Sequence, residues 1–289
     1  MDAHPRGRFA PSPTGPLHFG NLRTALVSWL QAHEQGGEWF VRMEDLDRVT
    51  ASAEHERAQL DALATLGLVS DLPVLRQSDR FDLYRDAIAT LVAQGRVYEC
   101  FCTRREIREA SSAPHGELPD GAYPGTCRSL TSADRARFEG EGRRPALRLR
   151  SEGERFVVPD LVMGDVPGGV DDVVLQRNDR VPAYNLAVVV DDAAQGVTVV
   201  VRGDDLISST PRQMLLQQLL GLPTPAYAHV PLVLVHGLAS NARLWDGPAR
   251  EFVRRGHPVL ALDLRGHGRS DRPDAGYDMA TVADDIAKV

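Results

Sequence analysis

The sequence almost lacks lysine. Among its 33 Lys and Arg residues the only lysine is Lys288, and all the others are arginines. The different chemistry of the two side chains does not account for so strong a bias, and we attribute it to coding composition. The scarcity nevertheless excludes every motif that needs a lysine upstream of position 288.

Long hydrophobic runs are absent as well. No apolar stretch approaches the roughly 18 residues of a membrane span, and the start, MDAHPRGRF, has no apolar core of a secretory signal. We therefore expect a cytoplasmic protein without a membrane partner. At 289 residues, 43% hydrophobic and 25% charged, the chain can form one large or two ordinary domains around a sizeable core.

Charge and cysteine content narrow the function classes further. A net charge of −7 argues against a protein that holds nucleic acid by bulk charge, although a local basic face stays open. The three cysteines are Cys100, Cys102 and Cys127. An odd number of neighbouring cysteines without an export signal favours a metal site or free thiols over disulfides.

Hydrophobic periodicity predicts an α/β domain with a parallel sheet, because strands and amphipathic helices alternate over the first hundred residues. The expected order is a strand in GRFAPSP, a helix over Asn21–His33, the strand EWFVRME, and helices over Glu54–Leu66 and Asp79–Gln94. A Pro/Gly/Ser-rich loop follows within residues 100–127. Later segments predict short strands (PALRLR, RFVVPD, DVVLQR), buried sheet elements (AYNLAVVVDD, GVTVVVRG), a helix over Thr210–Leu220 with Pro211 in its first turn, and a strand reached through PTPAYAHVPLVLV.

The segment RFAPSPTGPLHFGN, residues 8–21, is the most informative one. It combines the end of a strand, a rigid turn and the start of a helix that carries His18 and Asn21. Gly15 and Gly20 allow the backbone to approach a ligand, and a helix N-terminus offers unpaired N–H groups to phosphate. These features predict a nucleotide site, while an ordinary strand-to-helix turn with an incidental His18 remains the alternative.

The same segment resembles the first signature motif of class I aminoacyl-tRNA synthetases in its glutamyl form, with Asn21 in place of the final histidine. RMEDLDR at 42–48, AYNLAVVVDD and VVVRGDDL strengthen the resemblance, which extends over residues 6–234. It is strongest to the short glutamyl-queuosine tRNA(Asp) synthetase family. The resemblance implies a class I Rossmann-like catalytic domain over residues 1–229, with a small zinc-binding insertion at about 98–130.

The family resemblance also implies a function and its residues. Members activate glutamate with ATP and Mg²⁺ and attach it to queuosine in the anticodon of tRNA(Asp); we expect a monomer. His18 and Asn21 would be catalytic. The implied glutamate-binding residues are Arg8, Ala10, Ser12, Glu44, Tyr184 and Arg202. The implied ATP-binding residues are Pro11, Gly15, His18, Gly20 and Asn21.

The three cysteines fit the same resemblance. Cys100 and Cys102 followed by YPGTC, with Tyr123 and Cys127, are similar to the family's zinc site. Thiolates are ordinary ligands of tetrahedral zinc, but tyrosine is an unusual fourth ligand. His115 is the alternative fourth ligand, and free thiols are the alternative to a metal. The zinc would be structural rather than catalytic.

The character of the sequence changes near HVPLVLVHG, residues 229–237. A lysine-bearing KMSKS-type loop is expected after such a strand in the synthetase family, yet no lysine follows before Lys288. Residues 230–289 instead resemble the start of an α/β-hydrolase, in PLVLVHG and PVLALDLRGHGRSDRP. The nucleophile elbow G-x-S-x-G is missing, so Ser240 and Ser270 are interpreted as loop serines, and His236 and His267 are not assigned as catalytic bases.

We therefore expect most of a synthetase joined within VPLVL to an incomplete α/β-hydrolase-like tail, with weakened adenylation. Two alternatives are a hydrolase fragment without its nucleophile and a non-catalytic chimera that binds glutamate, ATP or tRNA. The origin of the fusion stays open. Two hydrolase strands cannot bury both faces alone, so we expect a loosely packed tail after about residue 236.

Overall fold

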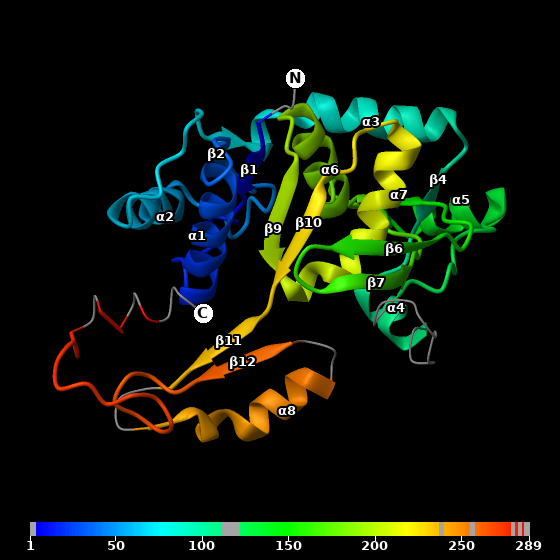
Figure 1. Ribbon diagram of the computed structural model, residues 1–289. Helices are drawn as coiled ribbons and strands as arrows, with labels where there is room; N and C mark the ends of the chain where they lie inside the picture. Colours follow the sequence, from blue (N-terminus) through cyan, green and yellow to red (C-terminus); the bar gives the residue numbers. More distant parts are fainter. Residues whose placement is uncertain are drawn as a thin grey trace.

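The structure is a computed structural model that describes residues 4–110, 122–236, 240–254 and 258–278, together with residues 281, 282 and 285. An α/β body contains the first ten strands, and a smaller C-terminal lobe is attached where strand β10 ends (Figure 1). In the described part of the chain, no helix is both long and apolar enough to cross a membrane.

Parallel strands form the centre of the body, as the alternating pattern predicts. One sheet has the order β1-β2-β3, formed by β1 (Arg6–Phe9), β2 (Glu38–Met43) and β3 (Leu75–Arg76). Another has the order β7-β6-β10-β9, formed by β6 (Arg155–Asp160), β7 (Gly164–Gly169), β9 (Val199–Gly203) and β10 (Ala226–Val230). The amide of Thr198 donates to the carbonyl of Arg6 at 3.0 Å, which joins the two sheets edge to edge.

Helices cover these sheets and close the core. The predicted helices are present as α1 (Phe19–His33), α2 (Ala53–Thr65), α3 (Phe81–Ala93) and α7 (Thr210–Leu220). Helix α1 packs directly on β1, because Gly7 leaves room: a Cβ there would lie 3.3 Å from the Cβ of Ala32. This close packing fixes the first turn of α1 beside the end of β1.

One prediction from the sequence is wrong. The apolar run AYNLAVVVDD does not enter a sheet but forms helix α6 (Tyr184–Ala194). All residues from Leu186 to Asp192 in this helix are buried. A helix that is buried on all sides has no polar face, so its sequence cannot be distinguished by periodicity from that of a buried strand.

The insertion between the two halves of the body is antiparallel. Its sheet has the order β4-β5-β8, with β4 (Val97–Cys100), β5 (Ala146–Leu149) and β8 (Val174–Gln176). Helices α4 (Arg104–Ala110) and α5 (Ser132–Gly140) flank it and were not predicted from the sequence, nor was strand β7. The capping box of α5, in which Thr131 and Asp134 bond each other's backbone, shows why that helix starts where it does.

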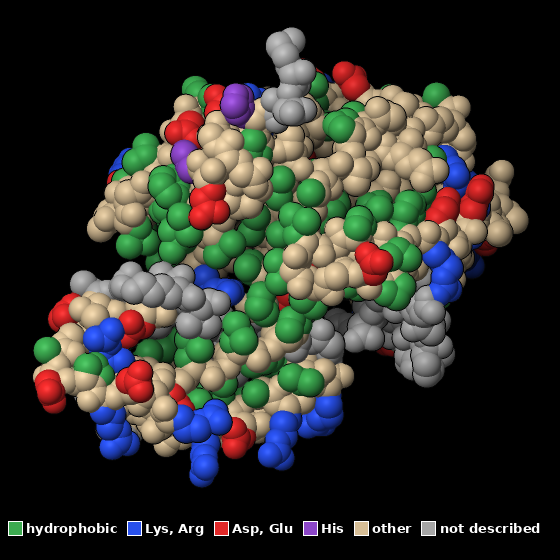
Figure 2. All heavy atoms as spheres, in the orientation of Figure 1, with side chains coloured by type: hydrophobic (Ala, Val, Ile, Leu, Met, Phe, Trp, Pro, Cys, Tyr) green, Lys and Arg blue, Asp and Glu red, His purple; other side chains and the backbone are tan. Residues whose placement is uncertain are grey.

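The C-terminal lobe contains a two-stranded parallel sheet and one helix. Strand β11 (Leu232–Val235) pairs with β12 (Val259–Leu262), and α8 (Asp246–Arg254) lies between them in sequence. Both strands were predicted, and α8 was not. Figure 2 shows the lobe set apart from the body, with arginine side chains along its outer edge. Helix α8 has no buried residue, which agrees with an incomplete core.

Candidate functional site

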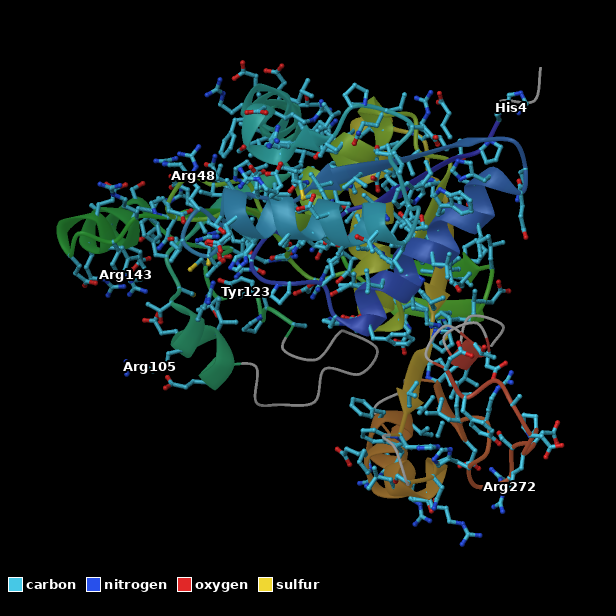
Figure 3. All side chains as sticks on the ribbon, turned by 90° about the vertical axis from the view of Figure 1, so that its left-hand side faces the viewer. His4, Arg48, Arg105, Tyr123, Arg143 and Arg272 are labelled. Atoms are coloured by element: carbon cyan, nitrogen blue, oxygen red, sulfur yellow. The ribbon has the colours of Figure 1, made fainter. Side chains whose placement is uncertain are left out.

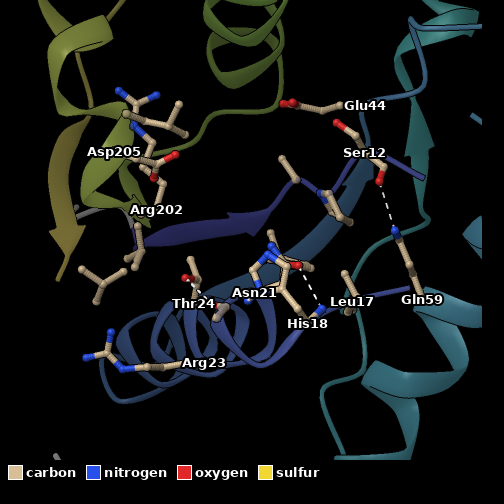
Figure 4. A pocket seen from close by; sticks show the side chains of 18 of the residues that line it. Ser12, Leu17, His18, Asn21, Arg23, Thr24, Glu44, Gln59, Arg202 and Asp205 are labelled. Carbon is tan, nitrogen blue, oxygen red and sulfur yellow. Dashed lines mark hydrogen bonds between the residues drawn. The ribbon is translucent and has the colours of Figure 1, made fainter. Parts of the chain in front are cut away.

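A pocket of about 670 Å³ opens at the carboxyl ends of β1, β2, β9 and β10, beside the first turn of α1. Parallel α/β sheets bind their ligands at this edge. All eleven synthetase-site residues implied by the sequence line it (Figure 4). They are Arg8, Ala10, Pro11, Ser12, Gly15, His18, Gly20, Asn21, Glu44, Tyr184 and Arg202.

The motif at the start of α1 holds its histidine by a reciprocal cap. The Nδ1 atom of His18 accepts the amide N–H of Asn21 at 3.3 Å, and the Oδ1 atom of Asn21 accepts the amide N–H of His18 at 3.1 Å. Because Nδ1 is an acceptor here, the Nε2 atom carries the proton of a neutral ring. No described residue bonds Nε2, so His18 can donate from the exposed helix terminus into the pocket.

Gly20 is needed for this arrangement. A Cβ on Gly20 would lie 3.1 Å from the Cε1 atom and 3.2 Å from the Nδ1 atom of His18. A side chain would therefore require the imidazole to shift by a few tenths of an ångström from its capping position. At Gly15 a Cβ would meet nothing within 4 Å, so this glycine faces open space in the pocket rather than the protein.

One wall of the pocket carries a carboxylate above a buried arginine. Glu44 follows β2, and its Oε1 atom lies 3.6 Å from the Nη2 atom of Arg42. Burial raises the pKa of Glu44 to about 7, although Arg42 and Arg8 oppose the rise. Glu44 thus changes its charge within the range of physiological pH.

Arg8 is buried in the floor of the pocket, with 3% of its surface exposed. Its Nε atom donates to Asp192 at 3.2 Å, and its Nη1 atom donates to the carbonyl of Val201 at 3.3 Å. Arg42 is fully buried behind Glu44 and donates to Asp192 at 2.8 Å. Asp192 therefore links the two arginines, and they hold its pKa below the ordinary value even though burial opposes its ionisation.

This buried ionic network was missed by the sequence analysis. Arg42 also lies 3.8 Å from Asp191, a carboxylate that accepts hydrogen bonds from Tyr84 and Gln77 as well. The only signals in the sequence were one arginine inside the apolar strand EWFVRM and two aspartates at the end of an apolar run. Charged residues in such surroundings are buried only when they are paired.

Arg202 lies at the end of β9 on the opposite wall and is 5% exposed. Its Nη1 atom donates to Gln213 at 2.8 Å and lies 3.4 Å from the hydroxyl of Tyr184. Its Nη2 atom donates to Thr210 at 2.8 Å, and its Nε atom donates to His229 at 3.0 Å. The guanidinium is therefore held by protein contacts, and Arg202 lines the pocket on the side away from Glu44 (Figure 4).

The three cysteines converge in the insertion. Their Sγ atoms all lie within 4.8 Å of one another, and those of Cys102 and Cys127 are 3.4 Å apart. The hydroxyl of Tyr123 lies 3.4 Å from the Sγ atom of Cys100 and 3.5 Å from that of Cys102. Figure 3 shows Tyr123 between the body and α4, which carries Arg105. The alternative ligand His115 lies outside the described residues.

These separations fit a tetrahedral zinc site. Bond lengths of about 2.3 Å to sulfur and about 2.0 Å to oxygen place sulfurs roughly 3.8 Å apart and a sulfur and an oxygen roughly 3.5 Å apart. The four residues can therefore hold one divalent ion without large rearrangement.

The tail does not present a hydrolase nucleophile at its serines. The hydroxyl of Ser270 donates to the backbone carbonyl of Asp263 at 2.5 Å, as expected of a loop serine. The Nε2 atom of His236 accepts the amide N–H of Leu264 at 3.0 Å, and its ring lies 5.1 Å from that of His267. These contacts fasten the loop after β12 to the end of β11.

Comparisons with known proteins agree with both parts of the chain. The family described as tRNA synthetases class I (E and Q), catalytic domain, matches residues 5–238, and the α/β hydrolase fold matches residues 230–289. The glutamyl-Q tRNA(Asp) synthetase of Nocardia farcinica is 60% identical over 228 residues, which cover 79% of this chain and 72% of that protein. The protein of the same name from Cutibacterium acnes is 54% identical over 281 residues, covering 96% of this chain and 74% of that protein.

A solved structure supports the same assignment. The glutamate tRNA ligase from Elizabethkingia meningosepticum, in complex with its amino acid, superposes with a TM-score of 0.70 at 28% identity. The superposition covers 96% of this chain and 56% of that one, so the chain spans just over half of that protein. The synthetase resemblance inferred from the sequence is confirmed, and the hydrolase-like segment has a family match of its own over residues 230–289. The chain belongs to the class I tRNA synthetases of the glutamyl and glutaminyl group.

Proposed function

We propose that the body of this protein activates glutamate with ATP and transfers it to queuosine in the anticodon of tRNA(Asp). The observation that carries the proposal is a single pocket that brings together Arg8, Arg202, the carboxylate of Glu44 and the helix-capping His18. Arg23, Asp204 and Asp205 also line this pocket. The names of the similar proteins support glutamate, a tRNA and the queuosine-bearing acceptor. The catalytic domain would comprise residues 1–229, with the insertion at about 98–130 and the hydrolase-like segment at 230–289.

The charges in the pocket suit glutamate in a definite orientation. Glu44, when ionised, binds the α-ammonium group, while Arg8, Arg202 and Tyr184 surround the carboxylate end, because guanidinium forks match carboxylates. Ala10 and Ser12 complete the wall between these poles. A ligand with one positive and two negative groups is thereby favoured over a neutral amino acid.

The reaction follows from this placement. The α-carboxylate oxygen of glutamate attacks the α-phosphorus of ATP, pyrophosphate leaves, and the mixed anhydride glutamyl-adenylate remains. A hydroxyl of the acceptor nucleoside then attacks the carbonyl carbon, and AMP leaves. The Nε2–H of His18 and the amides at the start of α1 bind phosphate oxygens as negative charge moves onto the leaving group. Pro11, Gly15, Gly20 and Asn21 shape that part of the pocket, and ATP brings its Mg²⁺ with it.

The proposed activity is weakened by the change of sequence after β10. Class I enzymes of this group supply a lysine from the loop that follows this strand, and residues 232–287 contain none. Loss of one preorganised charge donor costs roughly 10²–10³-fold in rate. We therefore expect slow adenylation and intact glutamate binding.

Glutamate-dependent exchange between ATP and pyrophosphate, measured without tRNA, tests the proposal. We expect slow exchange in the wild type, none in His18→Ala, and an increase of roughly 10²-fold or more when a lysine-bearing loop is inserted after Leu234. Glutamate binding without exchange even after that insertion would indicate a binding module instead. Transfer to queuosine-containing tRNA(Asp), compared with the same tRNA lacking queuosine, tests the acceptor.

We also propose that Cys100, Cys102, Tyr123 and Cys127 hold a structural zinc ion. The sulfur and oxygen separations given above support this assignment, as does the choice of thiolate ligands. No position of the cluster is left for a substrate, so the ion would fasten the insertion rather than act in the reaction. A metal analysis that finds no zinc in protein purified with zinc would contradict it.

We propose no hydrolytic activity for the tail. Its sequence matches the hydrolase fold, but it contains no G-x-S-x-G elbow. A serine-reactive fluorophosphonate probe should therefore leave the protein unlabelled, and stoichiometric labelling at one serine would revive the hydrolase alternative. The monomeric state and the cytoplasmic location stay predictions.

A further inference from the structure

A fully buried histidine stands behind the pocket at the end of β10. His229 has no exposed surface, and its side chain lies between Asp160, at the end of β6, and Arg202, at the end of β9. The Nδ1 atom of His229 lies 2.6 Å from Oδ2 of Asp160, and its Nε2 atom lies 3.0 Å from Nε of Arg202. Neither His229 nor Asp160 lines the pocket, so neither can contact the substrate directly.

The hydrogen bonds fix the protonation of this imidazole. A guanidinium only donates, so the Nε2 atom of His229 must accept from Arg202 and carries no proton. The remaining proton is on Nδ1 and is donated to Asp160. The ring is therefore neutral, which agrees with a pKa of His229 lowered to about 4, mainly by burial and then by the charge of Arg202.

Asp160 anchors the imidazole firmly. Its Oδ1 atom accepts the amides of Val162 and Met163, at 3.0 and 2.8 Å, in the turn after β6. Its oxygens also accept the backbone N–H of His229, at 3.1 and 3.2 Å. A carboxylate with this many N–H donors stays ionised inside the protein, and its pKa lies below the ordinary value although burial opposes this.

All the acceptors that hold Arg202 are uncharged. Besides His229 they are the hydroxyl of Thr210 and the side-chain carbonyl of Gln213, each at 2.8 Å, and the hydroxyl of Tyr184 at 3.4 Å. No described carboxylate forms an ion pair with Arg202, whereas Arg8 at the same pocket pairs directly with Asp192. The protein therefore orients Arg202 without neutralising it.

We propose that His229 is the positioning residue that gives this pocket its preference for a free carboxylate over a carboxamide. His229 bonds both Asp160 and Arg202, so Asp160 fixes the orientation of Arg202 without contacting it. The width of the imidazole ring separates the negative charge of Asp160 from the guanidinium of Arg202. This inference rests on the proposed function, because it deepens the role of Arg202 in glutamate binding. The ligand class it selects is an amino acid whose side chain ends in a carboxylate.

The reason is electrostatic. In a site of low dielectric constant, an arginine that already touches a carboxylate gains little from a second one, while an arginine with neutral partners retains its full attraction. A carboxamide carries no charge and gains less from the same contact. Discrimination between glutamate and glutamine therefore depends on what lies behind Arg202 as well as on Arg202 itself.

Two substitutions at His229 distinguish the loss of its hydrogen bond to Arg202 from the mere loss of the imidazole ring. In His229→Gln, the longer amide can still accept from Arg202 and donate to Asp160 without adding charge. In His229→Asn, the shorter amide keeps the contact to Asp160 but falls short of Arg202. Gln217→Leu is the matched control, because it removes another buried hydrogen bond between α7 and β10, from Gln217 to Tyr227 at 2.9 Å. It leaves every hydrogen bond of Arg202, and it keeps the ring of Tyr227, whose centre lies 5.4 Å from the Cζ atom of Arg202.

The assay is calorimetric binding of the non-hydrolysable sulfamoyl analogues of glutamyl-adenylate and glutaminyl-adenylate. We expect the wild type and His229→Gln to prefer the glutamyl analogue strongly, and His229→Asn to lose about tenfold or more of that preference. The loss should lie in the glutamyl analogue alone. ATP binding and the Tm of Gln217→Leu show how much of the lost affinity comes from a general destabilisation of the protein.

Each result is decisive. An unchanged preference in a folded His229→Asn overturns the inference, and so does a loss in His229→Gln equal to that in His229→Asn. Where His229→Asn does not fold, a folded His229→Gln with the wild-type preference supports it, and one without that preference overturns it. A wild type that binds neither analogue refutes the proposed function itself and the inference with it.

Discussion

The pH dependence of glutamate binding follows from the burial of Glu44. This carboxylate must be ionised to hold an α-ammonium group, yet burial raises its pKa to about 7. The charged groups that face it are Arg42, Arg8, Asp192 and Asp191, and the two arginines limit the rise. Glutamate affinity should therefore increase with pH across the neutral range.

The size of the effect can be worked out from that pKa. A group with a pKa of about 7 is about 10% ionised one pH unit below it and about 90% ionised one unit above it. Glutamate affinity should thus rise roughly tenfold between about pH 6 and about pH 8. The side-chain carboxyl of free glutamate, with a pKa of about 4.3, stays ionised throughout and does not contribute.

The stability of the ligand-free protein should change in the opposite sense. Because the pKa of Glu44 is raised above its unfolded value, its contribution is fully present at low pH and is lost as pH rises through about 7. Glu44→Gln, which cannot ionise, should be more stable than the wild type at about pH 8 by up to roughly 3 kcal/mol. The two proteins should converge in stability below about pH 4, where the carboxyl is protonated in the folded and the unfolded state alike.

The assays are calorimetric titration with glutamate and urea unfolding, each at several pH values. Asp82→Asn is the control, because that side chain is 83% exposed on α3 and lies outside the pocket. A wild type whose glutamate affinity does not change through the neutral range would refute the reasoning. An equal pH slope in Glu44→Gln would assign the titration to another group.

Four further changes test other parts of the structure. Arg42→Met removes the arginine that joins two buried aspartates; because Asp191 keeps Arg80 at 2.6 Å and Asp192 keeps Arg8 at 3.2 Å, urea unfolding should show a loss at the lower end of the range for a broken buried pair, about 3 kcal/mol; a change below about 1 kcal/mol would contradict the network. Gly20→Ala displaces the ring of His18, and pyrophosphate exchange should fall by up to about 10²-fold while glutamate affinity holds; unchanged exchange would remove His18 from the proposed mechanism. Cys127→Ser should reduce bound zinc from about one equivalent to well below it, and full occupancy by elemental analysis would exclude this ligand. Limited proteolysis should cut residues 240–254 before the body, because α8 buries nothing; equal resistance would show a well-packed tail.

Much of the fold could be predicted because local and tertiary preferences agree. Helix α1 has an apolar face, a capping residue and a strand before it, and each of these signals is readable in the sequence. Helix α6 was not predicted as a helix, because a helix buried on all sides has no polar face and its apolar run shows no helical period. Strand β7, GDVPGG, was not predicted because Gly and Pro are poor strand formers, and only its pairing with β6 defines it as a strand.

The pocket residues were predictable through a motif, but their support was not. The resemblance identified Arg8, Glu44 and Arg202, and the structure brings all three into one cavity. It assigned no role to Asp192 or His229, which lie within the quoted segments AYNLAVVVDD and HVPLVLVHG and bond Arg8 and Arg202 from behind the pocket wall. Contacts that span 184 residues, such as that between Arg8 and Asp192, depend on topology rather than on local pattern.

The connection between the two parts of the chain passes along the wall of the pocket. Only Pro231 separates β10 from β11, and its carbonyl accepts from Nη1 of Arg23 on α1 at 2.9 Å. Val230 and Pro231 both line the pocket, so every wall residue lies at or before position 231. The change of sequence beyond Pro231 therefore leaves every residue that lines the pocket in place and removes only the lysine-bearing loop expected after β10. Any sequence that follows Pro231 begins at the rim of the nucleotide pocket. A new loop or a reporter group grafted at this position would therefore lie beside the bound ligand.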